Sequence, residues 1–217
     1  MALIHRWPLT ENANDVVDGL HLTNNGTVTF SVDGASFNGS NQWLSGTKSI
    51  QTLSFSIWVK FSTAKTQIAF GFCGANYTDG LGTILENPVI LYGNGGYIEI
   101  KTSVDISDGQ FHCVVVTRNA ASTSHALFID GVQRAGTSNS FTMASNFAIG
   151  RLGSNNDWYY AGVAADARIY DHVLSEAESL DMYADGPNGS GGASVRTRIS
   201  TPVILAAMPT ALTRGFR

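Results

Sequence analysis

The feature that most constrains this chain is a strict alternation of apolar and polar residues. From position 53 to position 61 the apolar residues are Leu53, Phe55, Ile57, Val59 and Phe61, and the residues between them are Ser54, Ser56, Trp58 and Lys60. Successive side chains on a strand point to opposite faces, so a period of two indicates a strand with one apolar face. This segment is therefore expected to be a strand that contributes one face to a core.

Comparable segments recur at short spacing along the chain. They cover residues 28–32, 68–72, 89–92, 97–102, 112–118, 126–129, 147–150 and 163–170, and clusters of Asn, Gly, Asp and Ser separate them. Many short strands at such spacing predict a β-sandwich or a β-barrel. Asp130-Gly131 stands between two of these segments and predicts a tight hairpin, because Gly tolerates the positive φ that such turns require.

One short helix is expected near residue 175. Ser175 can cap its first turn, and Glu178 stands three residues later, where it completes a capping box. In this helix Leu180 and Tyr183 are expected to dock on the sandwich.

Composition and charge exclude several classes of protein. The chain has 217 residues, 43% of them hydrophobic, which is enough for a sizeable core, and a formal net charge of −4. No global basic field is available for a nucleic-acid backbone. The longest apolar run, residues 203–208, is too short to span a bilayer, and no secretory signal peptide is expected. Cys73 and Cys113 form no metal-binding motif, and whether they pair stays open.

The composition changes abruptly at Gly186. A Gly- and Ser-rich linker follows, and the last residues carry four arginines and no acid, so the first 186 residues carry a net charge of −8. We therefore divide the chain into a body, residues 1–186, and an arm, residues 187–217. The arm has too few apolar residues to fold alone and is expected to anchor on a partner. The residues expected to anchor it are Arg196, Arg198, Ile199, Val203, Leu205, Leu212, Arg214 and Phe216.

A series of short motifs in a fixed order resembles a known family. The series includes Trp7-Pro8-Leu9, Phe37-Asn38-Gly39, the segments 55–60 and 108–112, Leu127-Phe128-Ile129-Asp130-Gly131, Ala148-Ile149-Gly150 and the segment 165–170. Together they resemble a laminin-G-like domain of the concanavalin A-like lectin and glucanase superfamily. The resemblance implies an all-β fold, a two-sheet antiparallel jelly-roll sandwich. To this we add one short C-terminal helix and an extended C-terminal arm.

We expect the protein to be non-catalytic. Glycosidases of this superfamily carry paired carboxylates at alternating positions of one strand, and no such run exists here. Glu86 and Glu99 are solitary, and the acids at 176, 178 and 181 belong to the expected helix. No two histidines stand four residues apart with an acid between them, and no GxSxG motif is present.

The resemblance also implies a structural calcium ion. Asp166 matches the acidic position of the family's final-strand motif, and Pro8 and Gly39 lie in segments that would supply carbonyl oxygens. Asp15 and Asp18 are further candidate ligands. The alternative is that Asp166 pairs with Arg168 on the same strand.

A candidate glycan-binding loop combines aromatic rings with amide and carboxylate groups. It consists of Asn155, Asn156, Asp157, Trp158 and Tyr159. Aromatic faces stack on the apolar surfaces of sugars, and Asn and Asp bind hydroxyl groups. The alternative is that Trp158 only covers the sheet edge. Trp7, Trp43 and Trp58 are interpreted as packing residues.

These observations favour a lectin-like structural protein of a virion, of the phage decoration or fibre type. Its arm would attach it to a capsid or tail protein, with the body at the virion surface. The alternative is a carbohydrate-binding module of an extracellular glycan-binding protein, and a third possibility is an enzyme with an unrecognised site. Glycans and further copies of the chain remain open as partners, whereas nucleic acid and membrane insertion are not expected.

Overall fold

The computed structural model describes residues 2–47, 54–63, 65, 67–73, 80–85, 90–93, 98–119, 124–137, 146–152, 158–187 and 189, with backbone alone for 73, 80–84, 90–93, 98–101 and 137. In this part the chain forms fifteen strands and one helix. The helix is not long or apolar enough to cross a membrane.

Eight strands form the first sheet. Their order is β13 (Val132–Thr137), β12 (His125–Ile129), β11 (Phe111–Arg118), β6 (Ser54–Lys60), β15 (Ala161–Tyr170), β4 (Gly34–Asn38) and β3 (Thr29–Ser31), and β1 (Leu3–Trp7) also pairs with β15. The strands pair antiparallel, and β15 pairs with β4 through its first half and with β1 through its second half.

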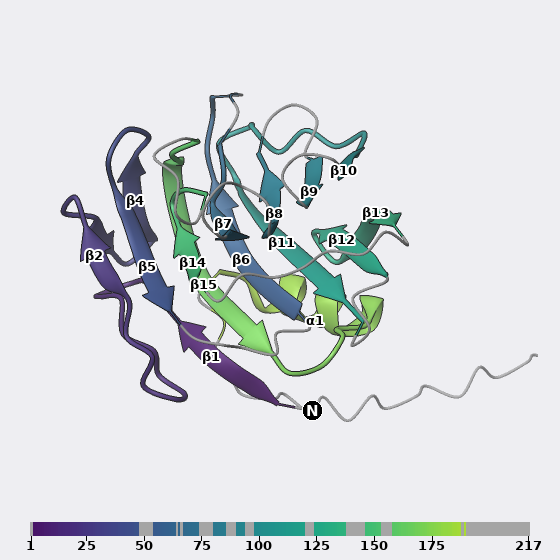
Figure 1. Cartoon of the computed structure of the whole chain (residues 1–217), viewed down its shortest axis with the longest axis horizontal. Helices are drawn as coiled ribbons and strands as arrows, with labels where there is room; N and C mark the ends of the chain where they lie inside the picture. The colour runs from purple at the N-terminus through teal and green to yellow at the C-terminus, as the bar shows by residue number, and fades with distance from the viewer. Residues whose placement is uncertain are drawn as a thin grey trace, which may run out of the picture.

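Seven strands form the second sheet, also with antiparallel pairing. Their order is β10 (Ile98–Lys101), β9 (Ile90–Gly93), β8 (Gly80–Ile84), β7 (Phe70–Cys73), β14 (Asn146–Ile149), β5 (Trp43–Thr47) and β2 (Thr23–Asn25). Figure 1 shows the strands of the two sheets in one body. This is the expected two-sheet antiparallel sandwich.

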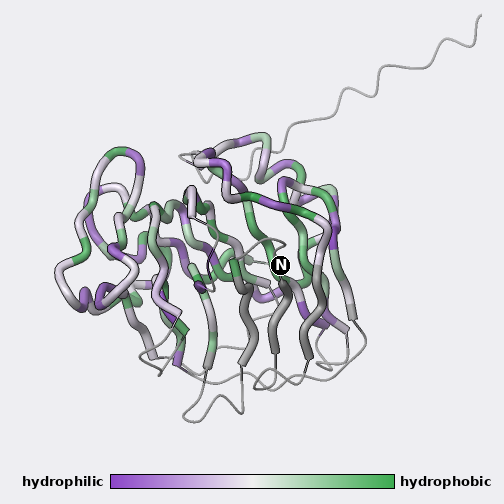
Figure 2. Tube along the Cα trace, turned by 90° about the horizontal axis from the view of Figure 1, so that it is seen from above, coloured by the Kyte–Doolittle hydropathy of each residue, from purple (hydrophilic) through white to green (hydrophobic). Residues whose placement is uncertain are grey.

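The main core lies between the sheets and confirms the alternation in β6. Phe55, Ile57 and Val59 are buried there, and the rings of Phe70 and Phe147 pack in the same cluster. Figure 2 shows hydrophobic stretches of chain running through the middle of the body. Apolar burial is the dominant stabilising term in such a sandwich.

A second apolar cluster lies on the outer face of the eight-stranded sheet, under the helix. Trp58, on the opposite face of β6 from the main core, packs there with Cys113, Phe128 and Met182. Cys113 is a free, buried thiol, and burial raises its pKa. Helix α1 (Glu176–Asp185) lies beside β11 in Figure 1 and contacts both β11 and β13.

The helix begins as expected, but its docking face differs from the prediction. Ser175 and Glu178 form the reciprocal capping box. The buried residues of α1 are Ser179 and Met182. The two residues predicted to dock contact the sandwich without being buried: Leu180 is 47% exposed although its side chain lies against Gly131, and Tyr183 is 41% exposed although its ring stacks on Trp58 at 5.8 Å. The helical period turns Met182, rather than Leu180, toward the sheet.

The predicted hairpin at Asp130-Gly131 joins β12 to β13, and both residues have positive φ, 54° and 77°. Helix α1 ends at Asp185, and Gly186 caps it. The carbonyl of Gly189 then accepts a hydrogen bond from the Arg6 guanidinium. The rest of the arm, from residue 190, lies outside the described residues.

Candidate functional site

The loop between β14 and β15 is closed at its base by backbone hydrogen bonds. The amide of Tyr160 donates to the carbonyl of Gly150 over 2.9 Å, and the amide of Gly150 donates to the carbonyl of Ala69 over 2.8 Å. The amide of Ile68 donates to the carbonyl of Trp158 over 3.0 Å. These bonds tie both ends of the loop to the segment that leads into β7.

Gly150 is required at this base. Its φ is +95°, and a Cβ atom there would lie 2.5 Å from the ring of Phe37. A larger residue would displace that ring or strain the backbone. Gly150 therefore sets the direction of the backbone at the start of the loop, just before Arg151.

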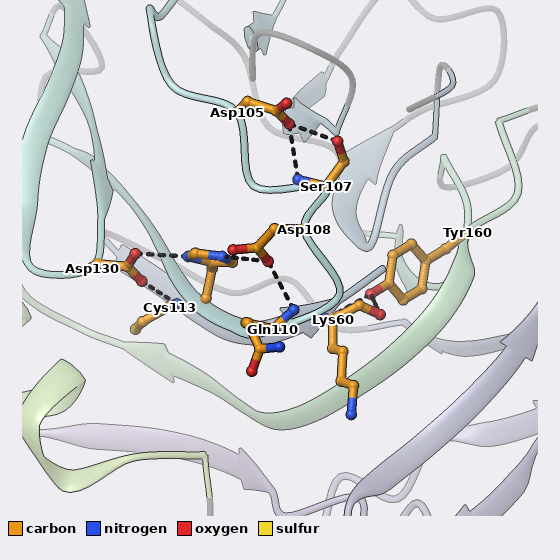
Figure 3. Close-up of polar contacts among 9 residues, drawn as sticks. Lys60, Asp105, Ser107, Asp108, Gln110, Cys113, Asp130 and Tyr160 are labelled. Atoms are coloured by element: carbon orange, nitrogen blue, oxygen red, sulfur yellow. Dashed lines mark hydrogen bonds and ion pairs between the residues drawn. The ribbon is translucent and has the colours of Figure 1, made fainter. Parts of the chain in front are cut away.

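Tyr160 fixes the other end of the loop. Its buried hydroxyl accepts a hydrogen bond from the amide of Lys60 over 3.0 Å and lies 3.0 Å from the carbonyl oxygen of the same residue (Figure 3). It also lies 3.0 Å from the carbonyl oxygen of Val163. Burial raises the pKa of this phenol, so it stays protonated. Since Tyr160 is pinned at the junction of β6 and β15, the positions of Trp158 and Tyr159 just before it are restricted.

Trp43, Arg151 and Tyr159 meet next to this loop. Leu44 is fully buried in the core, so the neighbouring Trp43 lies on the outer face of the seven-stranded sheet. The Arg151 guanidinium carbon lies 3.9 Å from the centre of the Trp43 ring, and the Tyr159 ring lies 6.0 Å from it, tilted by 55°. We call Trp43, Arg151 and Tyr159, together with Trp158, which precedes Tyr159 in the chain, the aromatic site.

The aromatic site has the chemistry of a sugar-binding platform. Trp43, Trp158 and Tyr159 are each partly exposed, and Arg151 is 9% exposed. Aromatic rings offer flat apolar surface, and a guanidinium stacked on a Trp ring holds that ring in place. Trp158 has a φ of 56°, a left-handed conformation that is rare for a bulky residue and often marks a functional position.

Two of these four residues, Trp158 and Tyr159, belong to the loop that the sequence suggests for glycan binding, and that role stays a prediction. Asn155, Asn156 and Asp157 lie outside the described residues. Trp43 was interpreted as a packing residue, and Arg151 was not considered. The pairing of Ile149 with Leu44 brings the two together, and this register depends on contacts more than one hundred residues apart in sequence.

Asp166 is held between two guanidinium groups. Its Oδ1 accepts a hydrogen bond from Nε of Arg6 over 2.7 Å, and its Oδ2 accepts hydrogen bonds from both Nε, over 3.0 Å, and Nη2 of Arg168. Its amide donates to the carbonyl of Pro8 over 3.1 Å. Asp166 is 1% exposed and has a φ of 46°. A cavity of about 510 Å³ lies beside Arg6, Pro8 and Asp166.

The residues around Asp166 do not fit the calcium ion that the family resemblance implies. Both carboxylate oxygens already bind positively charged groups, which would repel a divalent cation. Gly39 lies against Ala161, five residues along β15 from Asp166, or about 16 Å in an extended strand. Among the described residues no group of three or more His, Cys, Asp or Glu side chains could hold a metal ion. Pairing of Asp166 with Arg168 is what the geometry shows.

Asp15, the other candidate calcium ligand, organises the first loop instead. Its carboxylate accepts hydrogen bonds from the amides of Arg6, Val17 and Leu20, and Nδ1 of His5 lies 2.6 Å from it. Burial acts to raise the pKa of Asp15, but these hydrogen bonds outweigh it and hold the pKa below its usual value. Its oxygens are therefore occupied by groups of the protein.

A histidine with two carboxylates stands at the start of β11. Nδ1 of His112 lies 2.7 Å from Asp130, and its Nε2 lies 3.1 Å from Asp108 (Figure 3). Asp130 also accepts a hydrogen bond from the amide of Cys113. The hydrogen bond to Asp130 raises the pKa of His112, against the effect of burial, and Asp108 adds to it. With both ring nitrogens engaged, this cluster ties the strand to its neighbouring turns.

Of the anchoring residues and the acids considered for catalysis, the structure describes side chains only for the acids of α1. The anchoring residues Arg196, Arg198, Ile199, Val203, Leu205, Leu212, Arg214 and Phe216 lie outside the described residues, as does Glu86. The acids of α1 lie on a helix that covers the eight-stranded sheet, and one of them, Glu178, belongs to the capping box.

Solved structures share the fold of this chain at low sequence identity. Domain 4 of AbnA, an extracellular arabinanase from Geobacillus stearothermophilus solved with arabinotriose, has 20% identity and a TM-score of 0.69, over 83% of this chain and 98% of that chain. The binding domain of botulinum neurotoxin serotype D has 15% identity and a TM-score of 0.64, over 84% of this chain and 51% of that chain. A pentraxin from Limulus polyphemus has 14% identity and a TM-score of 0.58, over 70% of this chain and 81% of that chain.

These likenesses show the fold alone, and the chain spans about half the length of the toxin domain that it matches. No curated protein matches the sequence significantly. A family model, described as the concanavalin A-like lectin/glucanases superfamily, matches residues 33–178, which is more than half of the chain. Together with the two-sheet sandwich, this match shows that the chain belongs to the concanavalin A-like lectin/glucanases superfamily, as a laminin-G-like member.

Proposed function

We propose that this protein is a non-catalytic, lectin-like module that binds a carbohydrate at the aromatic site. The observation that carries the proposal is the meeting of Trp43 and Tyr159 on an outer sheet face, with Arg151 stacked at 3.9 Å from Trp43. The ring surface that Arg151 leaves uncovered suits the C–H face of a sugar ring, and Asn155, Asn156 and Asp157, which precede Trp158 in the sequence, would bind hydroxyl groups.

The comparisons support the carbohydrate class of ligand. The AbnA domain, which this chain matches over 98% of that domain, was solved in complex with arabinotriose. The body of this chain carries a net charge of −8, which disfavours acidic glycans. We therefore expect a neutral oligosaccharide as the ligand.

Glycan-array screening followed by calorimetry with the best neutral oligosaccharide tests this proposal. Tyr159→Ala removes one ring of the site and is expected to weaken binding about tenfold, since a lost stacking contact costs up to about 1.5 kcal/mol. Tyr183→Ala is the matched control, because Tyr183 is a partly exposed tyrosine on the opposite side of the sandwich. Equal affinity of Tyr159→Ala and the unaltered chain would contradict the site, and release of sugar from the bound oligosaccharide would contradict the non-catalytic assignment.

A second proposal concerns the arm. We propose that residues 187–217 attach the body to a capsid or tail protein of a virion, so that the body is displayed at the virion surface. What supports this is the composition of the arm, in which Val195, Thr197 and Ile199 alternate with Arg196 and Arg198. Such a segment suits addition to a partner's sheet edge, with its arginines against acids.

Incorporation into particles tests the second proposal. Deleting residues 190–217 keeps Gly189, which Arg6 binds, and is expected to leave a folded body that no longer joins particles. Circular dichroism checks the fold, and quantitative mass spectrometry of purified particles measures incorporation. Unchanged incorporation of the shortened chain would exclude the arm as the anchor.

A further inference from the structure

The outer side of helix α1 exposes apolar residues that a soluble surface usually hides. Leu180 is 47% exposed, Val173 44% and Tyr183 41%. Leu180 lies against Gly131 with both its backbone and its side chain, so the helix rests on the turn between β12 and β13. We call Val173, Leu180 and Tyr183 the α1 face. Exposed apolar residues gathered over one element mark an interaction surface more often than single scattered ones.

A groove continues the α1 face at the beginning of the helix. It has a volume of about 730 Å³ and lies over the outer face of β11, β12 and β13. Ala126 and Gly136 line it without long side chains, so the sheet is reached there with little obstruction. Val173 and Glu176 line its helix side. The groove is therefore open to an extended segment of chain that has crossed the α1 face.

The charge around this surface is negative. Helix α1 carries Glu176, Glu178, Asp181 and Asp185 and no basic residue. The arm carries four arginines and no acid. The surface and the arm are thus opposite in charge and alike in exposing apolar side chains, which is the complementarity that a specific contact requires.

We infer that the arm of the same chain docks along the α1 face and into the groove. The arm starts where α1 ends, because Gly189 is held by Arg6 directly after the helix cap. Helix α1 has ten residues and so is about 15 Å long. Ten extended residues after Gly189 reach about 33 Å, so Val195 and Ile199 can contact Leu180 and the residues beyond them can reach the groove.

The alternation of the arm suits this position. In an extended conformation Val195 and Ile199 share one face, and Arg196 and Arg198 share the other. The apolar face then lies on Leu180, and the long arginine side chains of the other face bend around the strand toward the acids of α1. Tethering makes the contact intramolecular, with an effective concentration in the millimolar range, so a weak contact suffices to keep the arm docked.

This inference goes beyond both proposed functions and is independent of the aromatic site. It adds a location for the arm when no partner is bound. Attachment to a virion partner would then involve release of the arm from α1, whereas glycan binding would be unaffected. The docked arm would also cover apolar surface that promotes association between copies of the chain.

Hydrogen-exchange mass spectrometry of the full chain tests the inference. In the unaltered chain, amides of residues 176–185 are expected to exchange about fivefold more slowly than in the double variant Arg196→Glu, Arg198→Glu, which leaves α1 itself unchanged. The double variant Arg214→Glu, Arg217→Glu has the same net charge but alters positions outside the segment that docks on the α1 face, and it is expected to exchange like the unaltered chain. Replacing Val195 and Ile199 with Ser is expected to speed exchange in the same peptides.

The outcomes separate the inference from its rivals. Equal exchange in the unaltered chain and the Arg196→Glu, Arg198→Glu variant would overturn docking. Equal acceleration by both charge variants would show a diffuse charge effect and would overturn the specific contact. Protection that grows with protein concentration, together with a dimer in light scattering, would show exchange of arms between copies and would overturn docking within one chain.

Discussion

Replacing Asp166 with Asn tests how much the buried ion pairs between β15 and Arg6 of β1 stabilise the fold. Asp166 is 1% exposed and lies between Arg6 and Arg168, whose side chains are 15% and 7% exposed. Asn has nearly the same size and tolerates the left-handed backbone, with a φ of 46°, that this position adopts. The substitution therefore removes the charge with little change in shape.

The expected loss follows from the burial of the charges that remain. Without the carboxylate, two guanidinium groups face each other in a poorly hydrated site without their counterion. Removal of one partner from a buried ionic group costs about 3–5 kcal/mol. We expect a decrease in the free energy of unfolding of about 3 kcal/mol, because Arg6 is partly exposed and regains some water. For a body of this size the decrease corresponds to a fall in melting temperature of about 6–12 °C.

Urea unfolding, followed by tryptophan fluorescence, measures the change in the free energy of unfolding. Asp33→Asn is the matched control, because Asp33 is exposed and is expected to change stability by less than about 0.5 kcal/mol. The same titration with calcium or a chelator separates an ion pair from a metal site: we expect the unaltered chain to be insensitive to both. A loss below about 1 kcal/mol for Asp166→Asn, or stabilisation of the unaltered chain by calcium, would refute the argument.

Two further predictions concern stability. Because Asp130, and after it Asp108, raise the pKa of His112 above its ordinary value of 6.5, the folded state keeps this proton longer than the unfolded state. His112 therefore stabilises the fold below about pH 6.5, and this contribution is lost as the pH rises through the raised pKa. The urea midpoint of His112→Gln should change less between about pH 6 and pH 8 than the midpoint of the unaltered chain. Parallel pH curves for the two proteins would contradict this. Gly150→Ala should lower the free energy of unfolding by about 2–3 kcal/mol, because its Cβ would lie 2.5 Å from Phe37. The control Gly19→Ala also has a positive φ but would meet no atom within 4 Å, so it should cost only about 1 kcal/mol. Equal losses in thermal unfolding would show that crowding at Phe37 is unimportant.

The fold could be predicted from the sequence because local patterns specify most of it. The alternation in residues 53–61 predicts which face of β6 is buried in the main core. The structure places the main core on that face and the second apolar cluster, under α1, on the other. The Asp130-Gly131 hairpin and the Ser175 capping box depend on a few adjacent residues, so they too are visible locally. The choice between Leu180 and Met182 as the docking residue required the rotation of the helix about its axis, which a short sequence with several apolar residues does not define.

The site was harder to predict, because its members come from separate strands. Trp43 and Arg151 contact each other only once β5 and β14 pair in register, and no local pattern encodes that register. Arg6 meets Asp166 across an interval of 160 residues for the same reason, so the sequence suggested Arg168 as the partner and not Arg6. The motif that suggested calcium identifies Asp166 but not its neighbours, and in this chain guanidinium groups bind both of its carboxylate oxygens.

The placement of the two candidate surfaces has a consequence for how the protein could work. The aromatic site lies on the outer face of the seven-stranded sheet, since its neighbour Leu44 points into the core, whereas α1 covers the outer face of the eight-stranded sheet. The arm leaves the body on the α1 side, where Arg6 binds Gly189. A partner that holds the arm would therefore approach that side and leave the aromatic site turned away from it. The sandwich between the two surfaces is a packed core, and such a core does not transmit small changes from one face to the other unless it has two stable arrangements. The affinity of the body for a sugar should therefore be the same whether its arm is docked, free or bound to a partner.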